Sequence, residues 1–195
     1  MTTRAHVPFR RSRPLPGRGP WRLAAVAAVA LVPLAACGDD DNGGAAPEAP
    51  GTVEVTAVDF AFEGLPERVP AGTRFTLANA APTELHEFVA FRLPDDEQRA
   101  VADLTALPPD ELLPALGGEP AAVLLTPPGG EMIPAVGDGT LSEPGRYAVL
   151  CVIPTGVDPQ VYLEAAAQSE GGPPQIEGAG PPHIVHGMFA ELVVE

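Results

Sequence analysis

Candidate ligands for one soft metal ion recur along the chain after residue 80. They are one histidine, one cysteine and a short segment with two further histidines and a methionine: His86, Cys151, His183, His186 and Met188. Imidazole binds copper in both oxidation states, a thiolate stabilises Cu(I), and a thioether can act as a weak axial ligand. Two imidazoles, one thiolate and one thioether are the donor set of a mononuclear electron-transfer copper site.

Each of these residues also has an ordinary structural explanation. His86 could be a hydrogen-bonded polar residue at the start of a strand. Cys151 lies between two aliphatic residues and could be a core thiol. Met188 could pack in the core, and His183, which follows two prolines, could lie in a surface loop. Only the joint presence of these residues favours metal binding over a metal-free domain.

The other cysteine stands in a different context. Residues 1–22 contain six arginines and no acid, residues 23–36 are almost wholly apolar, and Cys37 closes the small-residue box Leu34-Ala35-Ala36-Cys37. This pattern predicts a bacterial lipoprotein signal peptide over residues 1–37, with Cys37 as the lipidated residue. The apolar stretch is shorter than the roughly 20 residues that a membrane span requires. We therefore expect an extracytoplasmic protein that a lipid anchors to the cell membrane of a bacterium.

Composition separates a tether from a folded domain. Residues 38–52 are rich in Gly, Asp, Pro and Ala, which predicts a disordered tether. Residues 53–195 are enough for one domain with a hydrophobic core. If Cys37 is lipidated, Cys151 has no partner for an intramolecular disulfide, so this lone thiol outside the cytosol requires either burial or a metal.

The charge of the chain excludes some partners. The chain has no lysine and a formal net charge of −15 at pH 7. After residue 37 there are only five arginines, whereas all 26 acidic residues lie there. Such a surface argues against binding to nucleic acid and against electrostatic attraction to anionic lipid. It suits a basic partner protein, or it serves solubility alone.

The elements that must position these residues follow from the hydrophobic periodicity. Alternation with period two predicts strands at both ends of the chain, over residues 53–57 with a continuation through 59–62, 74–78, 87–93, 130–136, 146–152 and 189–194. Helical spacing predicts a helix over residues 95–107, capped by Asp95 or Asp96, and a second short helix over residues 109–116. Short strands with Pro/Gly turns predict an all-β sandwich with residues 94–130 as a partly helical insertion.

Three motifs occur in a set order around the candidate ligands. Asn79 precedes a predicted strand that begins next to His86. Pro144-Gly145-Arg146-Tyr147 introduces the strand that ends near Cys151. Farther on, a histidine stands five positions before a methionine, and a glycine directly precedes that methionine.

Together these motifs resemble the cupredoxins, the Greek-key β-sandwich copper proteins that include plastocyanin and azurin. The resemblance covers residues 53–93, 144–154 and 183–195. It implies a cupredoxin-like Greek-key fold that binds one type 1 copper ion and transfers electrons. The implied ligands are His86, Cys151, His183 and Met188. His186 does not fit the spacing and is expected to point away from the site.

The chain departs from this family between Cys151 and His183. Cupredoxins have a few residues there, whereas this chain has 31. Closing a flexible loop that is about tenfold longer costs on the order of 2 kcal/mol more. Residues 155–182 are therefore predicted to be a long loop insertion, with a helix over residues 161–168, that either covers the site or blocks it.

The predicted function is that of a membrane-anchored copper electron carrier. The alternative is a copper-free cupredoxin-like binding or structural module of the cell envelope. We do not expect an enzyme, because the sequence shows no Ser/His/Asp or paired-carboxylate spacing, no HExxH motif and no phosphate-binding loop. A copper chaperone is disfavoured because only Met132 and Met188 follow residue 37. The sequence does not identify a redox partner.

Overall fold

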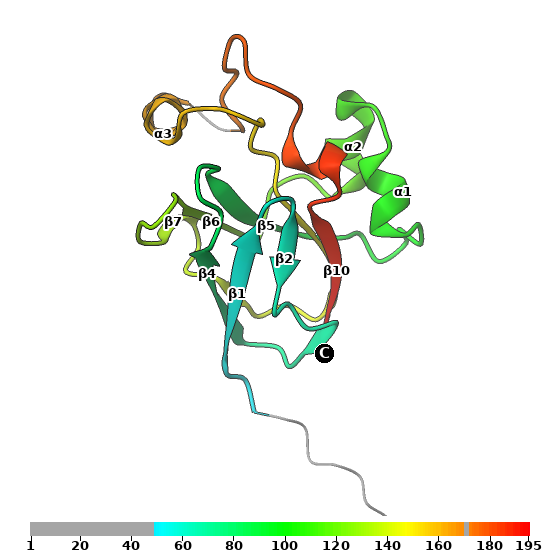
Figure 1. Cartoon of the computed structure of the whole chain (residues 1–195). Coiled ribbons are helices and arrows are strands. Elements are labelled where there is room, and N and C mark those ends of the chain that lie inside the picture. Colours follow the sequence, from blue (N-terminus) through cyan, green and yellow to red (C-terminus); the bar gives the residue numbers. More distant parts are fainter. Residues whose placement is uncertain (1–48, 170–171) are drawn as a thin grey trace, which may run out of the picture. The chain divides into compact units, whose positions relative to one another are not determined.

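Two β-sheets pack face to face in the computed structural model, which describes residues 49–169 and 172–195 (Figure 1). One sheet has the order β2-β1-β4-β8 and contains β1 (Thr52–Val58), β2 (Ala61–Glu63), β4 (Thr73–Asn79) and β8 (Thr140–Leu141). The other has the order β3-β10-β9-β5-β6-β7 and contains β3 (Arg68–Val69), β5 (His86–Arg92), β6 (Ala122–Thr126), β7 (Ile133–Val136), β9 (Gly145–Leu150) and β10 (Phe189–Val194). The prediction of an all-β sandwich is confirmed.

Aromatic side chains fill the space between the two sheets. Phe75 from β4 and Phe88 from β5 stack with their ring centroids 5.3 Å apart. Phe62 from β2 meets Phe88 edge to face at 6.1 Å. Burying one such side chain contributes about 1.5–3 kcal/mol to stability. These contacts fix the distance between the sheets and with it the positions of the strand ends.

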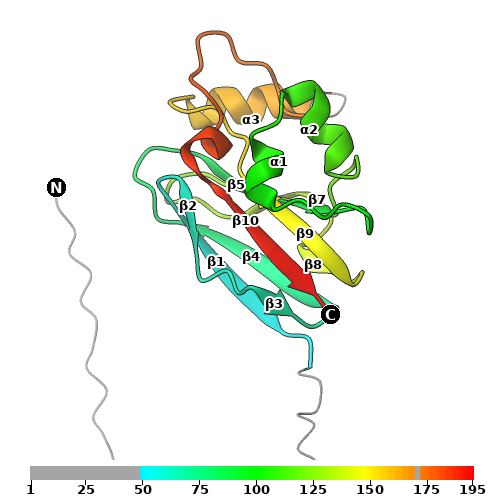
Figure 2. The ribbon, with the colours of Figure 1, turned by 90° about the vertical axis from the view of Figure 1, so that its right-hand side faces the viewer.

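The six-stranded sheet is buried on its outer face as well, because two short helices cover it (Figure 2). These are α1 (Val101–Thr105) and α2 (Pro109–Ala115), whose buried Leu104 and Leu112 belong to the same apolar cluster as Val89 and Phe91 of β5. Six consecutive residues of β5 are therefore buried. The segment predicted as a helical insertion thus closes the outer face of the sheet.

The structure corrects two predictions for this segment. The helix expected over residues 95–107 begins only at Val101, its N-cap Ala100 has no capping side chain, and Asp95 instead accepts a hydrogen bond from Arg92 Nη2 at 2.8 Å. The expected cap at Asp95 or Asp96 was wrong because residues 95–100 form a turn and irregular backbone ahead of the helix. The segment also contains β6, which no pattern predicted because this strand is mostly buried and shows no alternation.

The first strand does not continue through residues 59–62 as expected. The chain turns at Asp59 and Phe60 and returns as β2, so that Val58 lies opposite Ala61. Phe60 has a φ of 63°, in the left-handed region that bulky residues rarely adopt. The other predicted strands are present, although the one expected over residues 130–136 begins at Ile133.

A third helix, α3 (Pro159–Gln168), lies in the long segment between the candidate ligands (Figure 1). The Asp158 carboxylate caps it by accepting hydrogen bonds from the backbone N–H groups of Gln160 and Val161, and Pro159 occupies the first turn. Tyr162 is the buried residue of this helix. The predicted helix over residues 161–168 is thus present and starts two residues earlier.

Cys37 and the predicted signal peptide of residues 1–37 lie outside the described residues, as does the predicted tether up to residue 48. Strand β1 already begins at Thr52, inside the range assigned to the tether. Of the helices that the structure describes, none has the length and hydrophobicity needed to span a membrane.

Candidate metal centre

The three nitrogen and sulfur donors lie at one end of three adjacent strands. His86 is the first residue of β5, and Cys151 directly follows the last residue of β9. Because β5 and β9 are antiparallel neighbours, the start of one lies beside the end of the other. His183 opens the 3₁₀ helix η1 (His183–His186), which leads into β10 on the other side of β9. Sheet order therefore brings together residues that are far apart in sequence.

The long segment between Cys151 and His183 is closed at its base by backbone pairing. Four N–H groups donate across the base, namely Thr155 to Pro181 at 2.9 Å, Gly180 to Thr155 at 3.0 Å, His183 to Ile153 at 3.0 Å and Ile184 to Cys151 at 2.9 Å. The chain thus leaves and returns as a paired ladder, and the intervening loop does not displace His183 from Cys151. The extra residues of the loop therefore lie away from the site, and the length of the loop does not prevent the three residues from meeting.

The donor atoms converge on one point. Cys151 Sγ lies 3.3 Å from His183 Nδ1 and 3.9 Å from His86 Nδ1, and the three donor atoms all lie within 4.8 Å of one another. Each of the three side chains is 0% exposed. Both imidazoles present Nδ1 to the same sulfur, which is the arrangement that three ligands of a single ion require. The residues present therefore fit one metal ion.

Burial sets the protonation of these groups. It lowers the pKa of His86 to about 4, and the neighbouring His183 adds to this effect, while Asp59 and Glu84 oppose it. Burial likewise lowers the pKa of His183. It raises the pKa of the Cys151 thiol, and the Glu87 carboxylate adds to that rise. At neutral pH the metal-free site therefore holds two neutral imidazoles and a protonated thiol, and binding of a cation releases the thiol proton.

Met188 is fully buried beside this cluster. Its backbone N–H donates to the His183 carbonyl at 3.2 Å, and its carbonyl accepts a hydrogen bond from the Cys151 N–H at 3.1 Å. These two bonds tie the methionine to both ligand segments. Its role as an axial ligand stays a prediction.

His186 is exposed and lies outside the donor cluster, as expected. Its ring packs on Phe60 with centroids 4.6 Å apart. The same Phe60 ring meets the ring of His183 edge to face at 5.1 Å. Phe60, held in its left-handed conformation by the β1–β2 turn, therefore helps to cover the imidazole of His183. Strained backbone of this kind is common at functional sites.

Glu87 is a buried acid beside the site that the sequence analysis did not identify. It is 4% exposed, its Oε1 accepts a hydrogen bond from the Val152 N–H at 2.9 Å, and its own N–H donates to Cys151 Sγ at 3.4 Å. Burial raises its pKa to about 7, and the bond from Val152 opposes the rise. The signal in the sequence was an acid directly before four apolar residues of the same strand.

Replacing Glu87 with glutamine should make the stability of the metal-free protein less dependent on pH. The raised pKa means that the folded protein binds a proton that the unfolded chain releases, so the wild type loses stability as pH rises from 4.5 to about 7. The unfolding free energy of Glu87→Gln relative to the wild type should rise by on the order of 3 kcal/mol across this window.

Denaturant unfolding at a series of pH values measures this difference. Glu131→Gln, which removes a carboxylate at an exposed position, is the matched control. A constant difference between Glu87→Gln and the wild type from pH 4 to pH 8 would contradict the prediction.

No family model matches this sequence, and no curated protein matches it. Among solved structures, the chain is similar to dithionite-reduced auracyanin from Roseiflexus castenholzii, with 23% identity over 74% of this chain and 96% of that chain and a TM-score of 0.40. It is also similar to auracyanin A, a "blue" copper protein from Chloroflexus aurantiacus (20% identity, 75% and 100% coverage, TM-score 0.38), and to auracyanin B (22%, 77% and 93%, 0.32).

Proposed function

We propose that this protein binds one copper ion through His86, Cys151 and His183 and carries electrons. The observation that supports this most strongly is the convergence of two buried Nδ1 atoms on one buried Sγ. Copper supplies one-electron chemistry at such a site because thiolate and imidazole together accommodate both of its oxidation states.

The residues around the cluster favour copper over zinc. Structural zinc sites take four ligands from cysteine, histidine and carboxylate side chains. Here three such donors form the cluster, and the buried residue tied to them is Met188, whose thioether suits the weak axial position of a copper centre. The carboxylate of Glu87 bonds instead to a backbone N–H.

The surroundings of the cluster suit electron transfer better than catalysis on a bound substrate. Each of the three donors is completely buried, so a substrate has no access to the site. Two donors stand at ends of paired strands and the third is fixed by backbone bonds to the segment after Cys151. Ligands held in this way keep their geometry when the charge of the ion changes.

Addition of Cu(II) to the purified domain tests the proposed function. We expect one equivalent to bind and to produce an intense visible absorption that dithionite bleaches. If Cu(II) binds without that band, or does not bind, the copper-free module of the cell envelope becomes the better account.

We further propose that Cys37 anchors the mature protein to the outer side of the cell membrane. The arginine-rich leader, the apolar segment and the cleavage box support this. Cys37→Ser should release the protein from the membrane fraction or leave it unprocessed, which fractionation and mass spectrometry would detect. A Ser variant that stays processed and membrane-bound would contradict the proposed anchor.

The acidic charge of the chain favours a basic protein as the redox partner.

A further inference from the structure

Glu84 is a carboxylate beside the buried ring of His183 that the candidate ligand set does not use. Its Oε2 lies 3.4 Å from His183 Nε2, and its side chain is 16% exposed. That nitrogen is buried and makes no hydrogen bond. The opposite nitrogen of the ring, Nδ1, faces Cys151 Sγ. The imidazole is therefore held between a sulfur on one side and a carboxylate on the other.

The same carboxylate contacts the beginning of the long loop. The N–H of Gly156 lies 3.1 Å from Oε2 and 3.3 Å from Oε1 of Glu84. Gly156 directly follows Thr155, which pairs with the returning end of the loop at Pro181. Glu84 thus contacts the start of the loop and the histidine that ends it.

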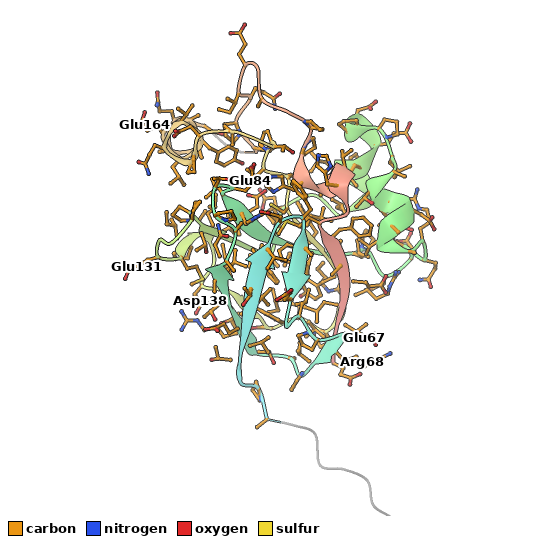
Figure 3. All side chains as sticks on the ribbon, in the orientation of Figure 1. Glu67, Arg68, Glu84, Glu131, Asp138 and Glu164 are labelled. Atoms are coloured by element: carbon orange, nitrogen blue, oxygen red, sulfur yellow. The ribbon has the colours of Figure 1, made fainter. Side chains whose placement is uncertain are left out.

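The segment that carries Glu84 is itself fixed to the sheets. Asn79 Nδ2 donates to the Glu84 carbonyl at 2.9 Å and to the Thr126 carbonyl at 2.8 Å, and its Oδ1 accepts from the Ala81 N–H at 2.8 Å. Figure 3 shows Glu84 at the end of the sandwich near α3, far from Glu67 and Arg68 at the other end. The carboxylate is therefore placed by rigid elements.

We propose that Glu84 is a positioning residue, which accepts a hydrogen bond from His183 Nε2–H when Nδ1 binds metal and ties the start of the loop to the site. This inference rests on the proposed function. An imidazole that binds a metal through Nδ1 carries its remaining proton on Nε2, and a carboxylate partner fixes that tautomer and the ring orientation. A buried N–H without an acceptor costs about 1–3 kcal/mol.

The separation of 3.4 Å exceeds the roughly 2.7–2.9 Å of a charge-assisted hydrogen bond. We therefore expect the Glu84–His183 contact to shorten once Nδ1 is bound. A carboxylate in this position makes the imidazole a stronger base and favours Cu(II) over Cu(I), so its charge should lower the reduction potential.

The test compares Glu84→Ala, Glu84→Gln and the wild type, with Glu164→Ala as the matched control. Glu164 is an exposed acid on α3 (Figure 3). Glu84→Ala should lower copper affinity by about 10- to 100-fold. Glu84→Gln keeps an acceptor oxygen and should lose less affinity, but both variants should raise the reduction potential because both remove the charge. Glu164→Ala should change neither quantity.

Two readouts need no copper. Hydrogen exchange of the Gly156 amide in the metal-free protein should be faster in Glu84→Ala than in the wild type. Imidazole NMR of the metal-free wild type should show the His183 proton on Nε2, protected from solvent, and Glu84→Ala should lose that protection.

Copper affinity and potential at wild-type values in Glu84→Ala would overturn the inference, even if Gly156 exchanged faster. If Glu84→Ala does not fold, the potential of Glu84→Gln decides, and an unchanged value overturns the inference. If the wild type forms no copper centre, the proposed function fails by itself. The exchange rate of the Gly156 amide and the protection of the His183 Nε2 proton then test the role of Glu84. If neither changes in Glu84→Ala, that role is overturned.

Discussion

Replacing Cys151 with serine is expected to abolish the visible absorption that copper produces in this protein. The band requires a thiolate bound to Cu(II), and the structure describes no other thiol that could take its place. A serine hydroxyl buried between two neutral imidazoles will not ionise, so affinity for copper should also fall severely. Absorption spectra and competition with a chelator of known affinity measure both effects.

Met188→Leu is the matched control for the loss of sulfur. Leucine fills a similar volume, and a weak axial ligand tunes the potential without holding the ion. We therefore expect this variant to keep an intense band and to shift its wavelength and the reduction potential. An intense band retained in Cys151→Ser would show that the proposed ligand set is wrong.

Replacing Tyr162 with alanine is expected to detach α3 from the sandwich. Tyr162 is 2% exposed and belongs to the main core together with Cys151 and Met188, whereas the partly buried Leu163 and Ile176 only pack against that core. Truncating a buried aromatic residue to alanine costs about 3–5 kcal/mol. Because backbone bonds such as Thr155 N–H to the Pro181 carbonyl close the base of this segment, the loss should appear mainly as local unfolding of residues 155–182.

Hydrogen exchange resolved along the chain measures this effect. The amides of α3 should lose protection in Tyr162→Ala, while β5 and β9 keep theirs. Tyr162→Phe retains the ring and should retain the protection. If α3 stays protected in Tyr162→Ala, the helix is held by contacts other than this side chain.

Local periodicity determined the strands at the two ends of the chain. The strand predicted over residues 189–194 has those bounds, and the strands near residues 53–57, 74–78, 87–93 and 146–152 differ from the structure by one or two residues. Alternation of side chains is a property of the extended backbone itself, so it is visible without knowledge of the neighbours. The same reasoning failed for β6, a mostly buried strand whose residues, Ala122 to Thr126, show no alternation.

The ligand types and their order were also visible in the sequence. The inventory of His86, Cys151, His183 and Met188 favoured a soft metal over a metal-free domain, and the structure brings the first three together. Sequence spacing separated His183 from His186, and the structure buries one and exposes the other.

Only the tertiary structure decided how the long segment after Cys151 returns to the site. The entropy of loop closure depends on the length of the loop. The position of His183 depends instead on backbone hydrogen bonds between residues 151–155 and residues 180–184, which no local pattern encodes.

The surroundings of the ligands were equally invisible in the sequence. Glu84, Glu87 and Phe60 reach the site because the end of β1, the start of β5 and the end of β9 lie on the same side of the sandwich. The sequence determined which atoms can bind a metal, because donor chemistry belongs to the side chain. Burial, the resulting pKa values and the carboxylate beside His183 depend on contacts between distant segments, which sheet order and the hydrogen bonds of the connecting loops set together.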